Sequence, residues 1–82
     1  MNKKKLLLRI LKNKKNIKFN EFISLVESFG FILDRTEGSH RVYKCISVSE
    51  ILNLQDRNGE AKPYQIREFL SYVEKYNLEM ED

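Results

Sequence analysis

The sequence predicts an α+β fold in which a three-stranded antiparallel sheet carries helices on one face. Apolar residues recur at helical spacing over residues 3–13, 20–29 and 63–76. Three short runs of β-forming residues follow one another between the second and third of these segments. Consecutive strands flanked by helices are typical of an antiparallel sheet with its helices on one side. We therefore expect the element order α-α-β-β-β-α.

The chain of 82 residues is long enough for one domain, which we expect to span residues 1–82. Residues 3–13 are predicted to form an N-terminal helix, and residues 20–78 the core of the domain. A chain of this length buries only roughly two thirds of its unfolded surface, so a single core must stabilise it. Nine aromatic residues and a hydrophobic content of 41% are sufficient for that core.

The two N-terminal helices are predicted from apolar spacing and from their end signals. The first carries the apolar residues Leu6, Leu7, Ile10 and Leu11. For the second, we expect Asn20 to be the N-cap, with Glu21 in the first turn, where the helix dipole favours an acid. Gly30 stands where a glycine commonly ends a helix.

The strands are predicted from β-forming residues and from the turn signals between them. The first spans residues 31–37 and the second residues 39–46, with Gly38 making the turn that joins them. The third spans residues 51–55. An Asn58-Gly59 turn follows, and Pro63 suits the first position of a helix that ends near Tyr76 or Asn77.

Alternation along the second strand separates its side chains onto two faces. His40, Val42 and Lys44 share one face, and Arg41, Tyr43 and Cys45 share the other. Tyr43 and Cys45 are the better core candidates, so we expect His40 and Lys44 on the open face of the sheet. A one-residue bulge would reverse this assignment.

Charge is distributed unevenly along the chain. Residues 1–18 hold eight Lys/Arg and no Asp or Glu, whereas residues 19–82 hold seven Lys/Arg and twelve Asp/Glu. The basic segment could contact phosphates of a nucleic acid, or it could simply form a solvated helix face. Its apolar run is too short and too interrupted by charge for a signal peptide, and no membrane partner is expected. Because Cys45 is alone, no intrachain disulfide can form, and we expect a cytoplasmic protein.

The chain resembles the HicA-type toxins of bacterial toxin–antitoxin systems. The resemblance is carried by Gly30-Phe31, Arg35, Gly38-Ser39-His40, the alternating residues through Tyr43, and Gly59 followed by Lys62-Pro63-Tyr64-Gln65-Ile66. It covers roughly residues 20–78 in a consistent order. Two features depart from the family pattern: Glu60 replaces a residue that is often basic, and residues 45–48 lack a frequent His-Pro pair.

This resemblance implies a function as well as a fold. HicA-type toxins have a double-stranded-RNA-binding-domain-like fold, whose α-β-β-β-α order the chain shares. They cleave mRNA without a metal or other cofactor, and a HicB-like antitoxin protein neutralises them by covering the site. Carried onto this chain, the family motif makes His40 the catalytic residue of an endoribonuclease.

Several side chains are candidates for contact with the RNA substrate. RNA supplies its own nucleophile, the ribose 2′-OH, so the enzyme must remove that proton and stabilise charge on the phosphate. Histidine is suited to the proton transfer, and nearby cations to the charge. We expect Ser39, Arg41, Lys44 and Lys62 to bind RNA, with Lys44 nearest in sequence on the same face as His40. The general acid that would protonate the leaving oxygen is left open.

Two other interpretations remain. The chain could be a non-catalytic RNA-binding module of the same fold, or an inactive relative that serves only as an interaction partner. Metal catalysis is disfavoured because Asp34 and Glu37, three residues apart on a regular strand, would point to opposite faces.

Overall fold

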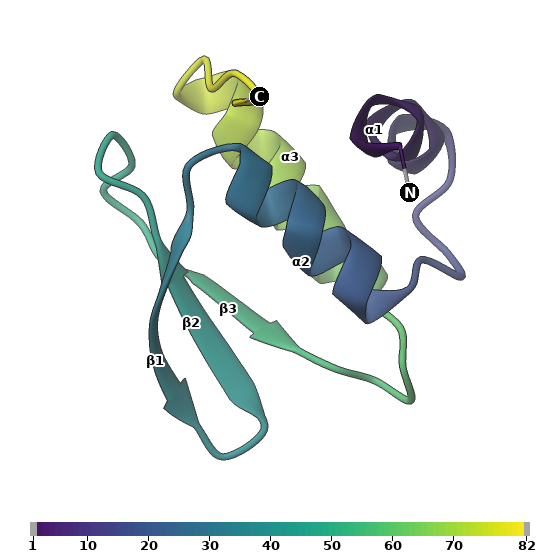
Figure 1. Cartoon of the computed structure of the whole chain (residues 1–82), viewed down its shortest axis with the longest axis horizontal. Coiled ribbons are helices and arrows are strands. Elements are labelled where there is room, and N and C mark those ends of the chain that lie inside the picture. The colour runs from purple at the N-terminus through teal and green to yellow at the C-terminus, as the bar shows by residue number, and fades with distance from the viewer. Residues whose placement is uncertain (1, 82) are drawn as a thin grey trace.

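A computed structural model of the chain describes residues 2–81 and confirms the α+β class and the expected element order (Figure 1). The elements are α1 (Lys3–Lys12), α2 (Phe19–Ser28), β1 (Ile32–Glu37), β2 (His40–Lys44), β3 (Leu52–Gln55) and α3 (Pro63–Lys75). The three strands form one antiparallel sheet in the order β1-β2-β3, so β2 is the central strand.

The elements are arranged in layers. Helices α2 and α3 cover one face of the sheet, and α1 packs against α2 on the side away from the strands (Figure 1). Within residues 2–81, no element covers the opposite face of the sheet. We call this uncovered side the open face.

The core is centred on Phe69 of α3. Its ring makes edge-to-face contacts with Phe22, Phe29 and Phe31, at centroid distances of 5.5, 5.4 and 6.1 Å. Such aromatic pairs contribute about 0.5–1.5 kcal/mol each beyond their burial. Because the three partners come from α2 and from the segment that leads into β1, Phe69 holds the last helix against both the second helix and the sheet.

The start of α2 corrects the prediction that Asn20 is its N-cap. The helix begins at Phe19, and Lys18 occupies the cap position without a side-chain hydrogen bond. Phe19 is buried, and its backbone N–H donates to the carbonyl of Gly59 at 2.8 Å. A tertiary contact therefore satisfies a helix-end donor that a capping side chain would otherwise bind. At the other end, the prediction for Gly30 is confirmed, since its φ is +94°.

The strand ends also differ slightly from prediction. β2 is shorter than residues 39–46 because Ser39 belongs to the turn and Cys45 begins another turn, closed by a hydrogen bond from Val48 N–H to the Cys45 carbonyl at 3.0 Å. The Asn58-Gly59 turn is confirmed, with φ values of 53° and 86°. Positive φ at both central residues is the requirement of a type I′ turn.

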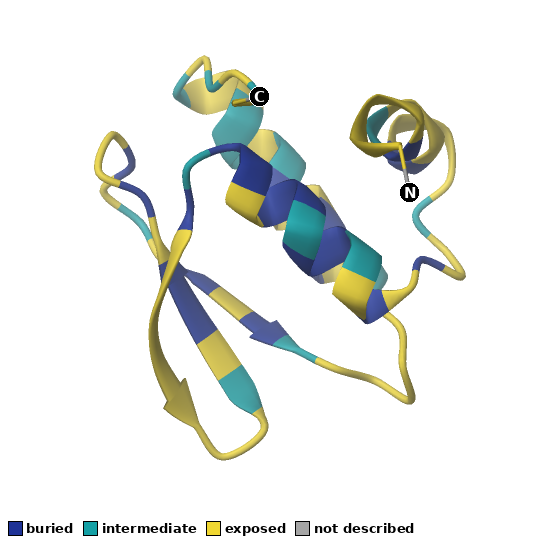
Figure 2. Ribbon diagram, in the orientation of Figure 1, coloured by how far each residue is buried: buried dark blue, intermediate teal, exposed yellow. Residues whose placement is uncertain are grey.

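β1 is an exposed edge strand with a bulge. All six of its residues are exposed (Figure 2), and its register against β2 shifts between Leu33 and Arg35. The expectation that Asp34 and Glu37 point apart was wrong for this reason. Both carboxylates bind the guanidinium of Arg35, each at 2.7 Å.

None of the helices in the described part of the chain combines the length and the apolar character needed to cross a membrane.

The contacts of Phe69 predict a large effect on stability. Phe69→Ala should lower the free energy of unfolding by about 3–5 kcal/mol, because it leaves a cavity among three rings. Urea unfolding followed by circular dichroism measures this loss. Leu8→Ala is the control, since Leu8 is 62% exposed and should change stability by less than about 0.5 kcal/mol. Equal effects of the two substitutions would contradict the assignment of Phe69 to the centre of the core.

A second prediction concerns acid stability. Hydrogen bonds from Tyr76 and Lys75 hold the pKa of the Glu50 carboxyl below its ordinary value of 4.5. A lowered folded pKa stabilises the protein above the unfolded pKa, and this contribution is lost as pH falls through the folded pKa. Glu50→Gln should therefore make stability fall less steeply below about pH 4.5. Urea midpoints of both proteins measured across that range test it, and parallel curves would contradict it.

Candidate functional site

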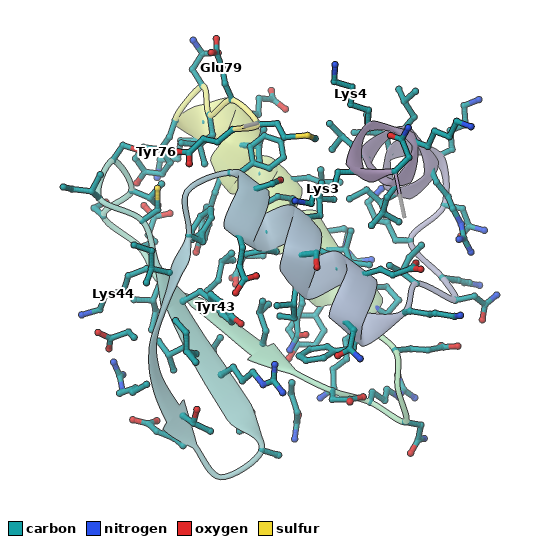
Figure 3. The ribbon with its side chains drawn as sticks, viewed as in Figure 1. Lys3, Lys4, Tyr43, Lys44, Tyr76 and Glu79 are labelled. Carbon is teal, nitrogen blue, oxygen red and sulfur yellow. The ribbon has the colours of Figure 1, made fainter. Side chains whose placement is uncertain are left out.

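The two faces of β2 lie as the alternation predicts. Tyr43 and Cys45 are buried in the apolar core, whereas Val42 is buried outside that cluster. Figure 3 shows Tyr43 directed toward the helices and Lys44 directed away from them. His40, which alternates with Val42 and Lys44, therefore lies on the open face, where it is partly exposed.

A hydrogen bond to β3 orients the His40 ring. Nδ1 of His40 lies 2.9 Å from Oδ1 of Asn53, whose strand position is opposite Val42 on the same face. With the Asn53 amide in this orientation, Nδ1 carries the hydrogen of the bond, because an amide oxygen can only accept. In the neutral ring the lone pair is then on Nε2, which is the state that a general base requires.

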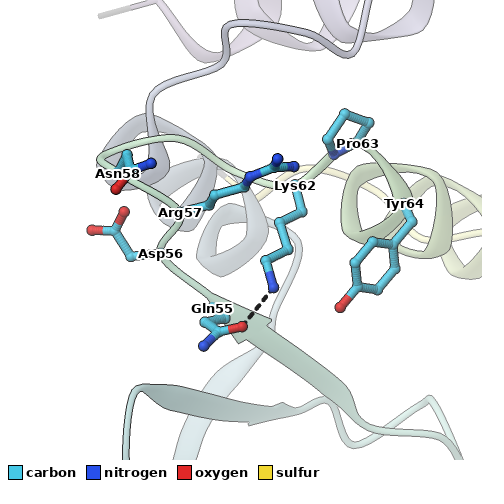
Figure 4. A pocket seen from close by; sticks show the side chains of 7 residues that line it. All are labelled: Gln55, Asp56, Arg57, Asn58, Lys62, Pro63 and Tyr64. Atoms are coloured by element: carbon cyan, nitrogen blue, oxygen red, sulfur yellow. Dashed lines mark hydrogen bonds between the residues drawn. The ribbon is translucent and has the colours of Figure 1, made fainter.

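A chain of hydrogen bonds links the residue before His40 to the start of α3. Gln55, the cross-strand neighbour of His40, donates through Nε2 to Ser39 Oγ at 2.8 Å. Its Oε1 accepts from Lys62 Nζ at 2.6 Å (Figure 4). Gln55 therefore joins two of the predicted RNA-binding residues, Ser39 and Lys62, at the His40 end of the sheet.

The position of Lys62 depends on how α3 begins. Pro63 occupies the first turn of the helix, as predicted, so Lys62 precedes it in extended conformation. The buried Gln65 accepts from the backbone N–H of Gln55 at 3.3 Å and donates to Tyr64 Oη at 3.3 Å. These bonds attach the end of β3 to the first turn of α3. Lys62 Nζ also lies 5.9 Å from the centre of the Tyr64 ring.

A pocket of about 490 Å³ adjoins this chain of hydrogen bonds (Figure 4). Its lining residues are Gln55, Asp56, Arg57, Asn58, Lys62, Pro63 and Tyr64. His40 is not among them, but its neighbour Gln55 is. The concave surface therefore begins beside His40 and extends toward the Asn58-Gly59 turn.

The other two cations predicted to contact RNA do not lie beside His40, because one is at the far end of β2 and the other is on the opposite face. Lys44 is on the open face, at the far end of β2, with its Nζ 3.6 Å from Asp34. Arg41 is on the opposite face, where its guanidinium lies 5.3 Å from the centre of the Phe19 ring. The structure thus brings Ser39 and Lys62 together with His40, and it separates Arg41 from them.

Arg35 is on the open face opposite Val42, but acids already surround it. The hydrogen bonds that Arg35 donates, to Glu37 first and then to Asp34, raise the pKa of its guanidinium. The hydrogen bond from Arg35 is in turn the main reason that the pKa of the Asp34 carboxyl is lowered. The positive charge of Arg35 is therefore balanced within β1, which weakens its attraction for a phosphate.

Metal binding needs several ligands in one place. Among residues 2–81, no group of three or more His, Cys, Asp and Glu side chains is arranged to hold a metal ion.

Asn53 and Gln55 are the residues of this site that were not predicted. Both alternate with the buried Leu52 and Leu54 along β3, so they share the open face with His40. That alternation is visible in the sequence and could have indicated polar partners for the histidine. The register that places Asn53 within reach of His40 depends on the β2–β3 pairing, which the sequence does not specify.

A comparison of the chain with protein-family models, curated proteins and solved structures finds no match in any of the three. The likeness to HicA-type toxins therefore rests on the motif residues and on the element order.

The hydrogen bond to Asn53 predicts the tautomer of His40. In mildly alkaline solution, ¹⁵N–¹H correlation spectra of the ring should show the Nδ1–H form predominating. Asn53→Ala removes the acceptor and should move the population toward the Nε2–H form. Asn53→Asp keeps an oxygen acceptor and should preserve the Nδ1–H form. A tautomer ratio that is the same in all three proteins would show that Asn53 does not orient the ring.

Proposed function

We propose that this protein is an endoribonuclease toxin of the HicA type, which cleaves mRNA by proton transfer through His40. The observation that carries the proposal is the His40–Asn53 hydrogen bond of 2.9 Å on the open face of the sheet. It orients an accessible imidazole with its Nε2 as the base. The type of reaction is inferred from the Gly38-Ser39-His40 motif, which resembles that of the family.

In the proposed reaction, Nε2 of His40 accepts the proton of a ribose 2′-OH. The 2′ oxygen then attacks the adjacent phosphorus, and the bond from phosphorus to the 5′ oxygen breaks. The products are a 2′,3′-cyclic phosphate and a 5′-hydroxyl end, with water protonating the departing oxygen. Lys62, held by Gln55 at the same end of the sheet, stabilises the negative charge on the phosphate.

The reaction as proposed uses no metal or other cofactor. The HicA-type family cleaves without one, and the ribose hydroxyl makes an activated metal-bound water unnecessary. Asp34 and Glu37, the carboxylates on β1 that could be ligands, are both bound to Arg35. In the cell, the substrate and the antitoxin partner would place the protein in the cytoplasm, where cleavage of mRNA would act as a stress response.

The open face also suits the proposed antitoxin partner. A HicB-like protein that covers the open face would exclude RNA from His40 and mask the partly exposed imidazole. We expect the adjacent gene to encode such a protein, and its co-expression to restore growth.

The proposal predicts the effect of removing the imidazole. Expression of the unaltered chain should arrest growth and fragment cellular RNA, whereas His40→Ala should lower cleavage by roughly 10²- to 10⁴-fold, the usual contribution of general acid–base catalysis. Purified protein and a labelled single-stranded RNA give the rate, and the cleaved ends should carry a cyclic phosphate. As a positioning control, Asn53→Ala should slow cleavage by roughly 2- to 13-fold, equivalent to a hydrogen bond of about 0.5–1.5 kcal/mol.

The same comparison of the unaltered protein with His40→Ala distinguishes a nuclease from a non-catalytic RNA-binding module. If the unaltered protein and His40→Ala bind RNA equally and neither cleaves it, the chain is a non-catalytic RNA-binding module.

A further inference from the structure

The linker between α1 and α2 is fixed beside the Asn58-Gly59 turn. The backbone N–H of Ala61 donates to the carbonyl of Ile17 at 2.8 Å, and that of Phe19 donates to the carbonyl of Gly59 at 2.8 Å. Nη2 of Arg9 donates to the carbonyl of Asn16 at 3.1 Å. These bonds hold the exposed Lys15 next to the turn that borders the candidate site.

A second pocket, of about 450 Å³, lies on the linker side of this turn. It is lined by Lys15, Asn16, Arg57, Asn58, Glu60, Ala61 and Pro63. Arg57, Asn58 and Pro63 line the first pocket as well, so the two pockets are neighbours across the same turn. We call these two neighbouring pockets, which together extend from Gln55, beside His40, to Lys15, the groove.

Three cationic side chains line this groove at successive positions. Lys62 lies at the Gln55 end, Arg57 is shared by both pockets, and Lys15 lies at the far end (Figure 4 shows the first two). Two acids also line it. The Asp56 carboxylate accepts the Gly59 N–H at 2.6 Å within the turn, whereas Glu60 is exposed in the second pocket and opposes the cations.

An aromatic residue stands at the Lys62 end. Tyr64 lines the first pocket and is 53% exposed, so its ring is accessible to a planar ligand. A basic groove with an aromatic side chain is the arrangement by which proteins bind single-stranded nucleic acids, with phosphates along the cations and a base on the ring.

We propose that the RNA strand cleaved at His40 continues through this groove, with its phosphates on Lys62, Arg57 and Lys15 and a base against Tyr64. The partner is a single-stranded RNA several nucleotides longer than the cleaved step. This inference rests on the proposed function and adds to it a binding track that includes the N-terminal segment, outside the part of the chain that resembles the family.

Binding of a 12-nucleotide RNA tests the track. At roughly 3.4 Å per nucleotide of a stacked strand, 12 nucleotides extend about 41 Å, which exceeds the longest dimension of the molecule, 30 Å. All variants carry His40→Ala so that the RNA stays intact. The measurement is fluorescence anisotropy of the labelled RNA at several salt concentrations.

Lys15→Gln should reduce the slope of log affinity against log salt by about 0.7 and weaken binding roughly fivefold at 0.1 M salt, because one phosphate contact is lost. The matched control is Lys5→Gln, which makes the same change of charge in the exposed first turn of α1. It should leave both quantities unchanged. Equal losses in the two variants would show diffuse attraction rather than a track, and no loss with Lys15→Gln would also overturn the proposal.

Glu60→Gln provides a test by gain of binding. Removing this carboxylate should strengthen binding of the 12-nucleotide RNA several-fold, whereas a smaller fraction of folded protein would lower the apparent affinity. Unchanged or weaker binding would contradict the placement of phosphates beside Glu60.

Failure of this inference differs from failure of the proposed function. If the protein with His40 intact cleaves RNA but the affinity for RNA does not change with Lys15→Gln or Glu60→Gln, the binding track is contradicted and the proposed nuclease activity is not. If the affinity changes as expected in both variants but the protein with His40 intact does not cleave RNA, the binding track is supported and the proposed nuclease activity is contradicted.

Discussion

The packing of Phe69 among the rings of Phe22, Phe29 and Phe31 determines which side of the sheet is covered. These contacts hold α2 and α3 together and press both against one face of the strands. Once that face is occupied, the polar side chains that alternate with Tyr43, Leu52 and Leu54 must lie on the other. The candidate site is therefore a consequence of core packing: the aromatic residues bury themselves, and the histidine and its amide partners remain on the side that is left.

The polar residues of the open face are connected rather than scattered. Asn53 binds the imidazole, and Gln55 links Ser39 to Lys62, so two amides on β3 organise groups from the β1–β2 turn, β2 and the start of α3. On β1 the bulge places two carboxylates around Arg35. Because these carboxylates neutralise its charge, Arg35 attracts a phosphate less strongly. The cations that line the groove lie toward α3 and the linker, and the acids of β1 are bound to Arg35 instead.

The sequence predicted the elements and their order because apolar period, glycines and Pro63 are local signals. It also predicted the face on which His40 lies, since alternation needs no partner strand. It failed where a distant contact decided the outcome. Gly59 replaces a side-chain cap for α2, and the bulge turns Asp34 toward Arg35. The pairing of His40 with Asn53 depends on strand register, which is set by the whole sheet.

The exposure of β1 has a further consequence for the motions of the molecule. Each of its six residues is exposed, and its hydrogen bonds are to β2 alone, so little apolar surface opposes its detachment. Segments with few buried contacts undergo local unfolding at a lower free energy than the core. The molecule therefore has two levels of stability: β1 can detach and re-form while the aromatic core stays intact. His40 is paired to this strand through Glu37 but held by Asn53 on β3, so the imidazole keeps its orientation during such openings.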